Sequence, residues 1–327
     1  MSSPLPWQSA QWQQLTDQYQ ANRLPHALLL TGIKGIGKVH FAKSFAESLL
    51  CDNRQIDGSA CGQCRSCLLI AAGSHPDLSI LMPEDDSKVI KIDQIRALIA
   101  SMTLTSQYAG YKVIIISPAD VMNRNAANSL LKTLEEPPAH TLLVLVTDKP
   151  AYLPATVRSR CHQLKFQTPE RNMALSWLKQ QPSRPEQAET LLDLASGGPF
   201  EALNLAKNDV LPLRVTQFTA FKGVAEGVHE PTKLASDWLK NGIKQPLYWV
   251  STWIMDIIRL KIVPQAPRLT NPDLRSNLQH FAEGLNLTGL YEFQEKITET
   301  LRLTETQCND QMLLEGLLIE WKRLQKN

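Results

Sequence analysis

Apolar and polar positions follow two different patterns along the chain. Short apolar or β-branched runs predict buried strands at residues 26–32, 77–82, 112–116, 141–147 and 162–166. Between them, apolar residues at helical spacing predict helices at 39–50, 91–102 and 125–136, and a Gln-rich segment predicts a surface helix at 8–20. Strands that alternate with helices favour βαβ units. We therefore expect an α/β domain with a mostly parallel sheet.

The strand pattern ends near residue 166. Residues 167–207 predict a small helical lid that is interrupted at Gly197-Gly198-Pro199. Residues 208–327 predict helices throughout, and Trp249, Trp253 and Trp321 lie within their apolar stripes, so we expect core side chains there. The predicted organisation has three parts, which are an α/β domain (1–166) with a Cys-rich insert (51–67), a lid (167–207) and an all-helical domain (208–327).

Charge and hydropathy exclude some classes of protein. The 327 residues include 34 Lys and Arg against 32 Asp and Glu, a net charge of +2. This balance excludes a strongly basic nucleic-acid coat protein, although it leaves a local basic groove open. No apolar run approaches the ~20 residues of a membrane span, and the first residues lack the pattern of a secretory signal. We expect a cytoplasmic protein without membrane contact.

Residues 32–38 read GIKGIGK and match the phosphate-loop motif G-x-x-x-x-G-K. The motif lies between a predicted strand and a predicted helix, which is the context that it requires. Backbone N–H groups at Gly32, Gly35 and Gly37 would surround a phosphate at a helix N-terminus, and Lys38 would reach the terminal phosphates. The alternative is a glycine-rich turn without a ligand.

The groups that hydrolysis needs beside this loop are missing. Val39 stands where a Ser or Thr hydroxyl would bind Mg²⁺. Ser117 and Pro118 stand where an Asp-Glu pair would support Mg²⁺ and orient water, and we expect Asp120 to face elsewhere. The sequence thus predicts a vestigial phosphate loop that does not hydrolyse ATP or bind ATP and Mg²⁺ productively. Weak residual nucleotide binding stays open.

Four of the six cysteines, Cys51, Cys61, Cys64 and Cys67, are spaced C-x₉-C-x₂-C-x₂-C. Four soft ligands fit a tetrahedral structural zinc ion without an open position for catalysis. An iron–sulfur cluster is the competing metal interpretation, and free surface thiols, which oxidise readily, are the other alternative. We expect the remaining two, Cys161 and Cys308, to be buried thiols.

Five motifs in a fixed order carry a family resemblance. They are HALLLTG (26–32), the GIKGIGK loop, the cysteine insert, LLKTLEEPP (130–138) and SRC (159–161). Together they resemble the clamp-loader branch of the AAA+ proteins. The loss of catalytic acids beside a retained SRC is similar to the delta-prime family of bacterial DNA polymerase III. The resemblance covers at least residues 20–205, and residues 309–321 resemble the last helix of that family's collar domain.

The resemblance assigns Arg160 of the SRC motif as an arginine finger. It would reach ATP on a neighbouring ATPase subunit, where a guanidinium stabilises the charge that develops on the γ-phosphate. The alternative is a surface arginine in a salt bridge, and Arg158 is the nearest side chain that could be mistaken for the finger. Thr147 matches the residue that senses the γ-phosphate in active relatives, and Phe200 replaces their second sensor, an arginine.

The resemblance also places LLKTLEEPP near a subunit boundary. Lys132, Glu135 and Glu136 would lie on an exposed helical face or at its end. A contact role and a solvated helix end are both open for each side chain.

The function implied is that of a non-hydrolysing accessory subunit of the DNA polymerase III holoenzyme. It would join gamma/tau ATPase subunits and a delta subunit in a hetero-pentamer through its helical collar. That assembly opens the sliding clamp and closes it on primed DNA.

Two alternatives remain. The first is an active gamma/tau-type ATPase, against which Val39, Ser117, Pro118 and Phe200 argue. The second is a zinc-stabilised nucleic-acid protein that acts alone. It would need a basic, aromatic-rich patch, whereas the cysteine segment carries only Arg54 and Arg65 and no aromatic residue.

Overall fold

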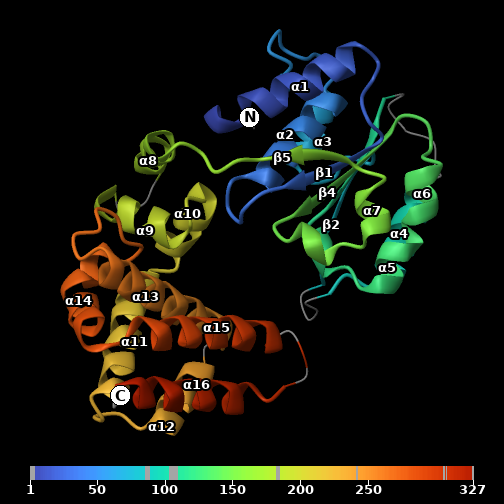
Figure 1. Ribbon diagram of the computed structural model, residues 1–327. Helices are drawn as coiled ribbons and strands as arrows, with labels where there is room; N and C mark the ends of the chain where they lie inside the picture. The colour runs from blue at the N-terminus through green and yellow to red at the C-terminus, as the bar shows by residue number, and fades with distance from the viewer. Residues whose placement is uncertain are drawn as a thin grey trace. The chain divides into compact units, whose positions relative to one another are not determined.

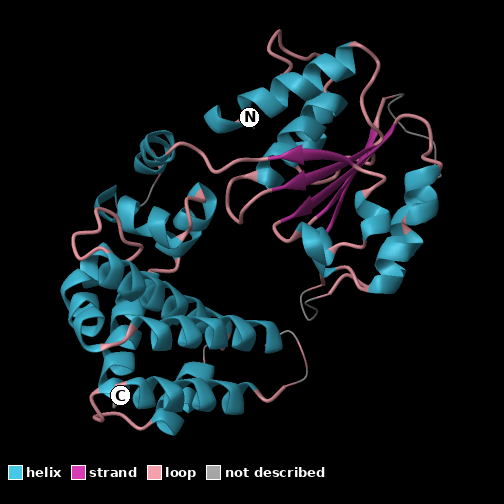
Figure 2. Ribbon diagram, viewed as in Figure 1, coloured by secondary structure: helices cyan, strands magenta, loops and turns pink. Residues whose placement is uncertain are grey.

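The chain forms two compact units. The computed structural model describes residues 4–84, 89–102, 110–181, 185–240, 242–304, 306 and 308–325. The first unit comprises Met1–Trp177 with Gly197–Glu201, and the second comprises Leu178–Ser196 with Ala202–Asn327. Within the described residues all strands belong to the first unit, and the second is helical (Figure 2). The division into three parts, with boundaries after residues 166 and 207, stays a prediction.

The described strands of the first unit form one parallel sheet, which confirms the predicted α/β class. Their order is β2-β3-β4-β1-β5. The three central strands are buried along their whole length, as expected for a parallel sheet covered on both faces. The strands are β1 (Ala27–Thr31), β2 (Leu78–Leu81), β3 (Lys112–Ile116), β4 (Thr141–Thr147) and β5 (His162–Lys165).

Helices cover both faces of this sheet (Figure 1). Side chains alternate along β1, so Leu28 and Leu30 pack with Trp12 and Phe41 on one face. Leu29 packs on the other face in a cluster with Leu134. The helical segments are η1 (Pro6–Gln8), α1 (Ser9–Gln20), α2 (Lys38–Leu50), α3 (Arg65–Ala71), α4 (Ile92–Met102), η2 (Ala119–Val121), α5 (Arg124–Ser129), α6 (Leu131–Glu135), η3 (Pro150–Tyr152), α7 (Ala155–Arg158) and α8 (Arg171–Lys179).

The prediction of a single helix at 125–136 is wrong, because the structure has two helices there, α5 and α6. The Ser129 hydroxyl donates to the carbonyl of Ala126 at 2.7 Å. The Leu130 N–H then bonds to Ala127, three residues back, at 3.3 Å. A side chain that competes for a backbone carbonyl weakens the helical ladder, and the chain restarts as a second helix at Leu131.

The second unit is built around one apolar cluster. The three predicted core tryptophans are all buried in it, and the Trp321 ring stacks on Phe221 at 4.4 Å. The helical segments after α8 are η4 (Pro185–Gln187), α9 (Ala188–Leu194), α10 (Pro199–Lys207), α11 (Val210–Ala225), α12 (Pro231–Leu239), α13 (Lys244–Ile262), η5 (Pro272–Leu274), α14 (Arg275–Gly284), α15 (Leu287–Leu303) and α16 (Asp310–Leu324). None of the described helices is both long enough and apolar enough to cross a membrane.

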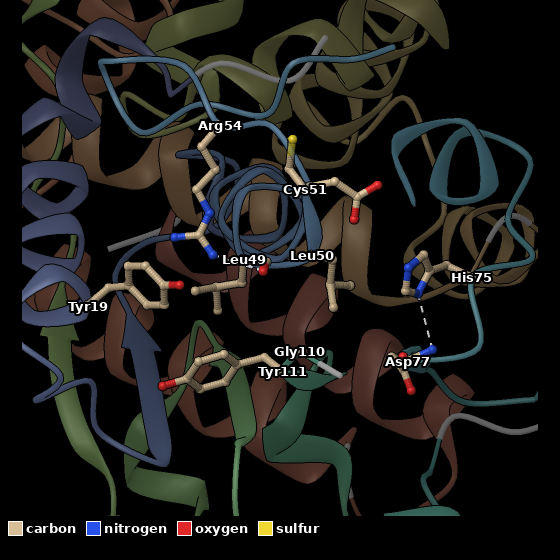
Figure 3. A pocket seen from close by; sticks show the side chains of 10 residues that line it. Tyr19, Leu49, Leu50, Cys51, Arg54, His75, Asp77, Gly110 and Tyr111 are labelled. Carbon is tan, nitrogen blue, oxygen red and sulfur yellow. Dashed lines mark hydrogen bonds between the residues drawn. The ribbon is translucent and has the colours of Figure 1, made fainter. Parts of the chain in front are cut away.

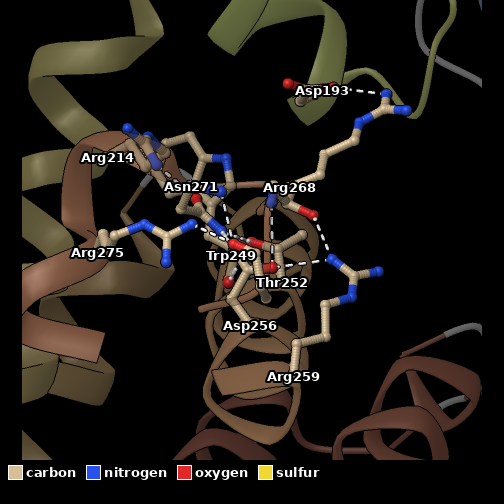
Figure 4. A network of polar contacts seen from close by, with 11 residues as sticks. Asp193, Arg214, Trp249, Thr252, Asp256, Arg259, Arg268, Asn271 and Arg275 are labelled. Atoms are coloured by element: carbon tan, nitrogen blue, oxygen red, sulfur yellow. Dashed lines mark hydrogen bonds and ion pairs between the residues drawn. The ribbon is translucent and has the colours of Figure 1, made fainter. Parts of the chain in front are cut away.

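A buried polar network holds the loop that follows α13 (Figure 4). Asp256 is fully buried and accepts the backbone N–H groups of Thr270 and Asn271 at 3.0 and 2.7 Å. It also accepts an Arg259 N–H at 2.8 Å. The buried Arg214 guanidinium donates to the side chains of Asn271 and Asp273. These buried charges have partners that offset the cost of removing them from water.

Candidate functional site

The phosphate-loop motif lies where the sequence predicts it, between β1 and α2. Gly35 and Gly37 have φ values of +75° and +90°, a conformation that side chains rarely adopt. The Trp7 indole N–H donates to the Ile36 carbonyl at 2.9 Å, and the Gln8 amide donates to the Gly37 carbonyl at 3.0 Å. The N-terminal segment therefore fixes the loop from one side.

Lys38, the residue that would reach a phosphate, is bound by the protein itself. Its buried ammonium donates to the carbonyls of Gly32 and Ile33 at 2.8 and 2.7 Å and to Asp148 at 2.5 Å. An ammonium has three N–H donors, and these three acceptors match them. Burial lowers the pKa of Lys38 below its usual value, against the opposing effect of the Asp148 carboxylate.

Phe200 and Glu201 pack directly against the loop. The Phe200 N–H donates to the Gly35 carbonyl at 2.7 Å, and Lys34 pairs with Glu201 at 3.0 Å. A Cβ added to Gly35 would lie 2.4 Å from the Glu201 Cβ. Phe200 thus supports the loop and lines a cavity of about 440 Å³ beside it.

Thr147 and Asp120 bond to each other at the end of β4. The Thr147 hydroxyl donates to an Asp120 carboxylate oxygen at 2.5 Å and accepts the Lys149 N–H at 2.9 Å. Asp120 also acts on Lys38 electrostatically, and the expectation that it faces away from the phosphate loop stays a prediction. The 3₁₀ turn η2 brings its side chain back towards β4.

We expect Lys38→Met to lower the free energy of unfolding by about 2 kcal/mol, because buried acceptors would lose their donor. Urea unfolding checks this. Lys34→Met is the matched control, since Lys34 is 68% exposed and its ion pair contributes little. Unchanged stability together with lost function would show that Lys38 is reserved for a phosphate.

The four clustered cysteines form a group that could hold a metal ion. Their sulfur atoms all lie within 4.8 Å of one another. The sulfur atoms of Cys51 and Cys64 are 3.9 Å apart, and those of Cys61 and Cys67 are 4.0 Å apart. Four thiolates about 2.3 Å from one tetrahedral ion would be about 3.8 Å apart. The spacing therefore fits a single ion.

Backbone N–H groups point at these sulfur atoms. Gln63 and Cys64 donate to the Cys61 sulfur at 3.4 and 3.3 Å, and these bonds lower the pKa of Cys61 to about 6. Burial has the opposite effect on Cys51 and Cys67, whose pKa values rise. A bound cation would favour the thiolate form of these two buried side chains, against the effect of burial.

A cavity of about 420 Å³ lies beside Cys51 (Figure 3). The Arg54 guanidinium lies 3.9 Å from the centre of the Tyr19 ring, and Tyr111 lines the same cavity. The spacing of the cysteines could not predict either aromatic ring here, because Tyr19 comes from α1 and Tyr111 is the residue before β3. The carboxylates of Asp52 and Asp77 also line it, so the cavity is not the basic patch that a nucleic-acid protein would need.

Arg160 lies two residues after α7 and pairs with Glu135 at the end of α6. Its Nε and Nη2 atoms lie 2.8 and 2.5 Å from one oxygen of Glu135, and its Nη1 atom lies 2.9 Å from the Thr156 carbonyl oxygen. The guanidinium side chain remains 35% exposed. The sequence did not pair Arg160 with Glu135, although it predicted that Lys132, Glu135 and Glu136 would be exposed, as they are.

The two remaining cysteines differ from each other. Cys161 is buried, as expected, and burial raises the pKa of its thiol to about 12. Cys308 is exposed, so its prediction is wrong. It directly precedes Asn309, whose side chain caps α16, and thus lies outside the packed helical faces.

Two family models match the chain. One, described as "DNA polymerase III, delta subunit", matches residues 7–170. The other, described as "DNA polymerase III, delta subunit, C terminal", matches residues 208–323. Together they cover both the sheet and most of the helical second unit.

Full-length relatives share this description. DNA polymerase III subunit delta' of Pseudomonas aeruginosa is 36% identical over 99% of both chains. Its Escherichia coli counterpart is 31% identical over 96% of this chain and 94% of its own. A tau/gamma subunit of Haemophilus influenzae matches only 43% of this chain and 20% of its own length. A solved gamma subunit-related protein of Thermotoga maritima overlaps with a TM-score of 0.45 and 16% identity, over 95% of this chain and 98% of its own. The chain belongs to the DNA polymerase III subunit delta' family.

Proposed function

We propose that this chain is a non-hydrolysing subunit of the DNA polymerase III clamp loader. The observation that carries the proposal is the Lys38 ammonium, which is matched by three acceptors of its own chain. The absence of a Mg²⁺-binding hydroxyl at Val39 and of acids at Ser117 and Pro118 points the same way. The loop Gly32, Gly35, Gly37 and Lys38 is then a structural remnant of a nucleotide site.

The contribution of this chain to catalysis is Arg160, acting in trans as an arginine finger. A guanidinium on a side chain that is 35% exposed has the chemistry to stabilise the charge on a transferring phosphoryl group. Its partners are gamma/tau ATPase subunits and a delta subunit in a hetero-pentamer. The sliding clamp and primed DNA are handled by the whole complex, in the cytoplasm.

The metal of Cys51, Cys61, Cys64 and Cys67 is a structural zinc ion. The sulfur separations of 3.9 and 4.0 Å support one ion, because an iron–sulfur cluster would hold its cysteine sulfurs farther apart. Zinc would join the end of α2 to the start of α3 and so order the insert between them.

ATP hydrolysis tests the proposal. The purified chain is assayed alone and then with gamma/tau subunits, delta subunit, clamp and primed DNA. No turnover by the chain alone and strong turnover in the mixture are expected. Turnover by the chain alone would establish an active ATPase instead.

A further inference from the structure

We propose that Glu135 is a positioning residue that orients the Arg160 guanidinium for the phosphate of a neighbouring subunit. This inference rests on the proposed role of Arg160 in trans. It follows from the geometry of the pair rather than from its charge.

The hydrogen bonds of Arg160 divide its five N–H groups into two sets. Glu135 Oε1 accepts a hydrogen bond from Nε and lies 2.5 Å from Nη2 as an ion pair, and the Thr156 carbonyl accepts a hydrogen bond from Nη1. In the part of the chain that the structure describes, these are the only acceptors that bond to the guanidinium. At least one N–H therefore remains on each terminal nitrogen, and such a pair can bind two phosphate oxygens at once.

Glu135 and Thr156, which bind Arg160, both belong to segments that are packed against the sheet domain's apolar core. Leu134, Val157 and Cys161, which neighbour Glu135 and Arg160 along the chain, belong to one buried apolar cluster. The imidazole Nε2 of His26, the residue before β1, lies 2.9 Å from the Leu134 carbonyl oxygen. The end of α6 is therefore tied to the sheet, and the Glu135 carboxylate has a defined place relative to α7.

Stability does not account for the pair. Glu135 is 51% exposed and Arg160 35% exposed, and ion pairs at such positions contribute little to folding. A carboxylate also offsets part of the positive charge that a phosphate would attract. The ion pair with Glu135 would instead hold the flexible Arg160 side chain in one orientation. Orientation matters because misplacing a reacting group by about 1 Å can cost about 100-fold in rate.

Glu135→Ala in the full-length chain, assembled with gamma/tau and delta subunits, tests the inference. With clamp and primed DNA, we expect kcat for ATP hydrolysis at the served site to fall by about 10- to 100-fold with KM nearly unchanged. Glu135→Gln should retain most of the rate, because its amide oxygen can accept the same Nε–H. Glu136→Ala is the matched control, since Glu136 is the next residue and is also exposed.

A double variant separates this inference from the function on which it rests. Glu135→Ala combined with Arg160→Ala should be no slower than Arg160→Ala alone if Glu135 acts through Arg160. An unchanged or faster rate for Glu135→Ala, with a large loss for Arg160→Ala, would overturn the positioning role and leave the finger in place. A normal rate for Arg160→Ala would instead overturn the proposed function.

Discussion

Arg160→Ala is expected to abolish most of the DNA-stimulated ATP hydrolysis of the assembled loader while assembly stays normal. An arginine finger contributes about 10³ to 10⁵ in kcat at the ATP site that it serves. The loss would arise in a neighbouring active site. In this chain's own phosphate loop, the Lys38 ammonium is bonded to two backbone carbonyls and to Asp148 instead of a phosphate. Steady-state hydrolysis and size-exclusion chromatography of the same preparations measure the two effects.

Arg158→Ala is the matched control for this experiment. Arg158 is the last residue of α7, two positions before Arg160, and it should be dispensable for hydrolysis. Arg160→Lys adds a second comparison, since lysine keeps the charge but lacks the planar fork of donors. Normal hydrolysis by Arg160→Ala in an intact assembly would rule out the trans role.

Loss of the metal should have the second large effect, on stability. Cys64→Ser, or chelation of the wild-type chain, is expected to release one zinc ion per chain and to lower the melting temperature of the first unit. Structural zinc sites bind with an apparent free energy on the order of 10 kcal/mol, all of it available only to the folded state. Cys64 also caps α3 by accepting the Cys67 N–H, and serine is a good N-cap, so Cys64→Ser removes the metal ligand while a cap can be kept.

Metal analysis and thermal unfolding check this expectation together. Cys308→Ser is the matched control, because Cys308 is exposed and lies in the second unit. Several iron atoms per chain with visible absorption would favour a cluster. A metal-free protein with an unchanged melting temperature would remove the metal centre altogether.

The sheet could be predicted from the sequence because its signals are local. The apolar runs at 112–116 and 141–147 coincide with β3 and β4, and the glycine motif between a strand and a helix located the loop. The cysteine spacing likewise predicted a cluster that the fold brings together. The division of α5 from α6 was missed, because it depends on one serine hydroxyl.

What the sequence could not predict are contacts between distant segments. Lys38 is held by Asp148, 110 positions away, and Arg160 by Glu135, 25 positions away. Neither carboxylate has a spacing that marks its partner, because the sheet order decides which chain ends meet. The same is true of Tyr19 and Tyr111, which reach the cysteine insert only in three dimensions.

The residues that make up the first unit decide where a truncated fragment of the chain can end. Gly197–Glu201 belongs to it, although the residues on either side belong to the second unit. A fragment that stopped at Trp177 would lose the Phe200 N–H that binds Gly35, together with the ring that packs 4.9 Å from Trp177 itself. The first unit is thus not one continuous stretch of sequence, and a fragment meant to contain all of it has to extend at least through Glu201.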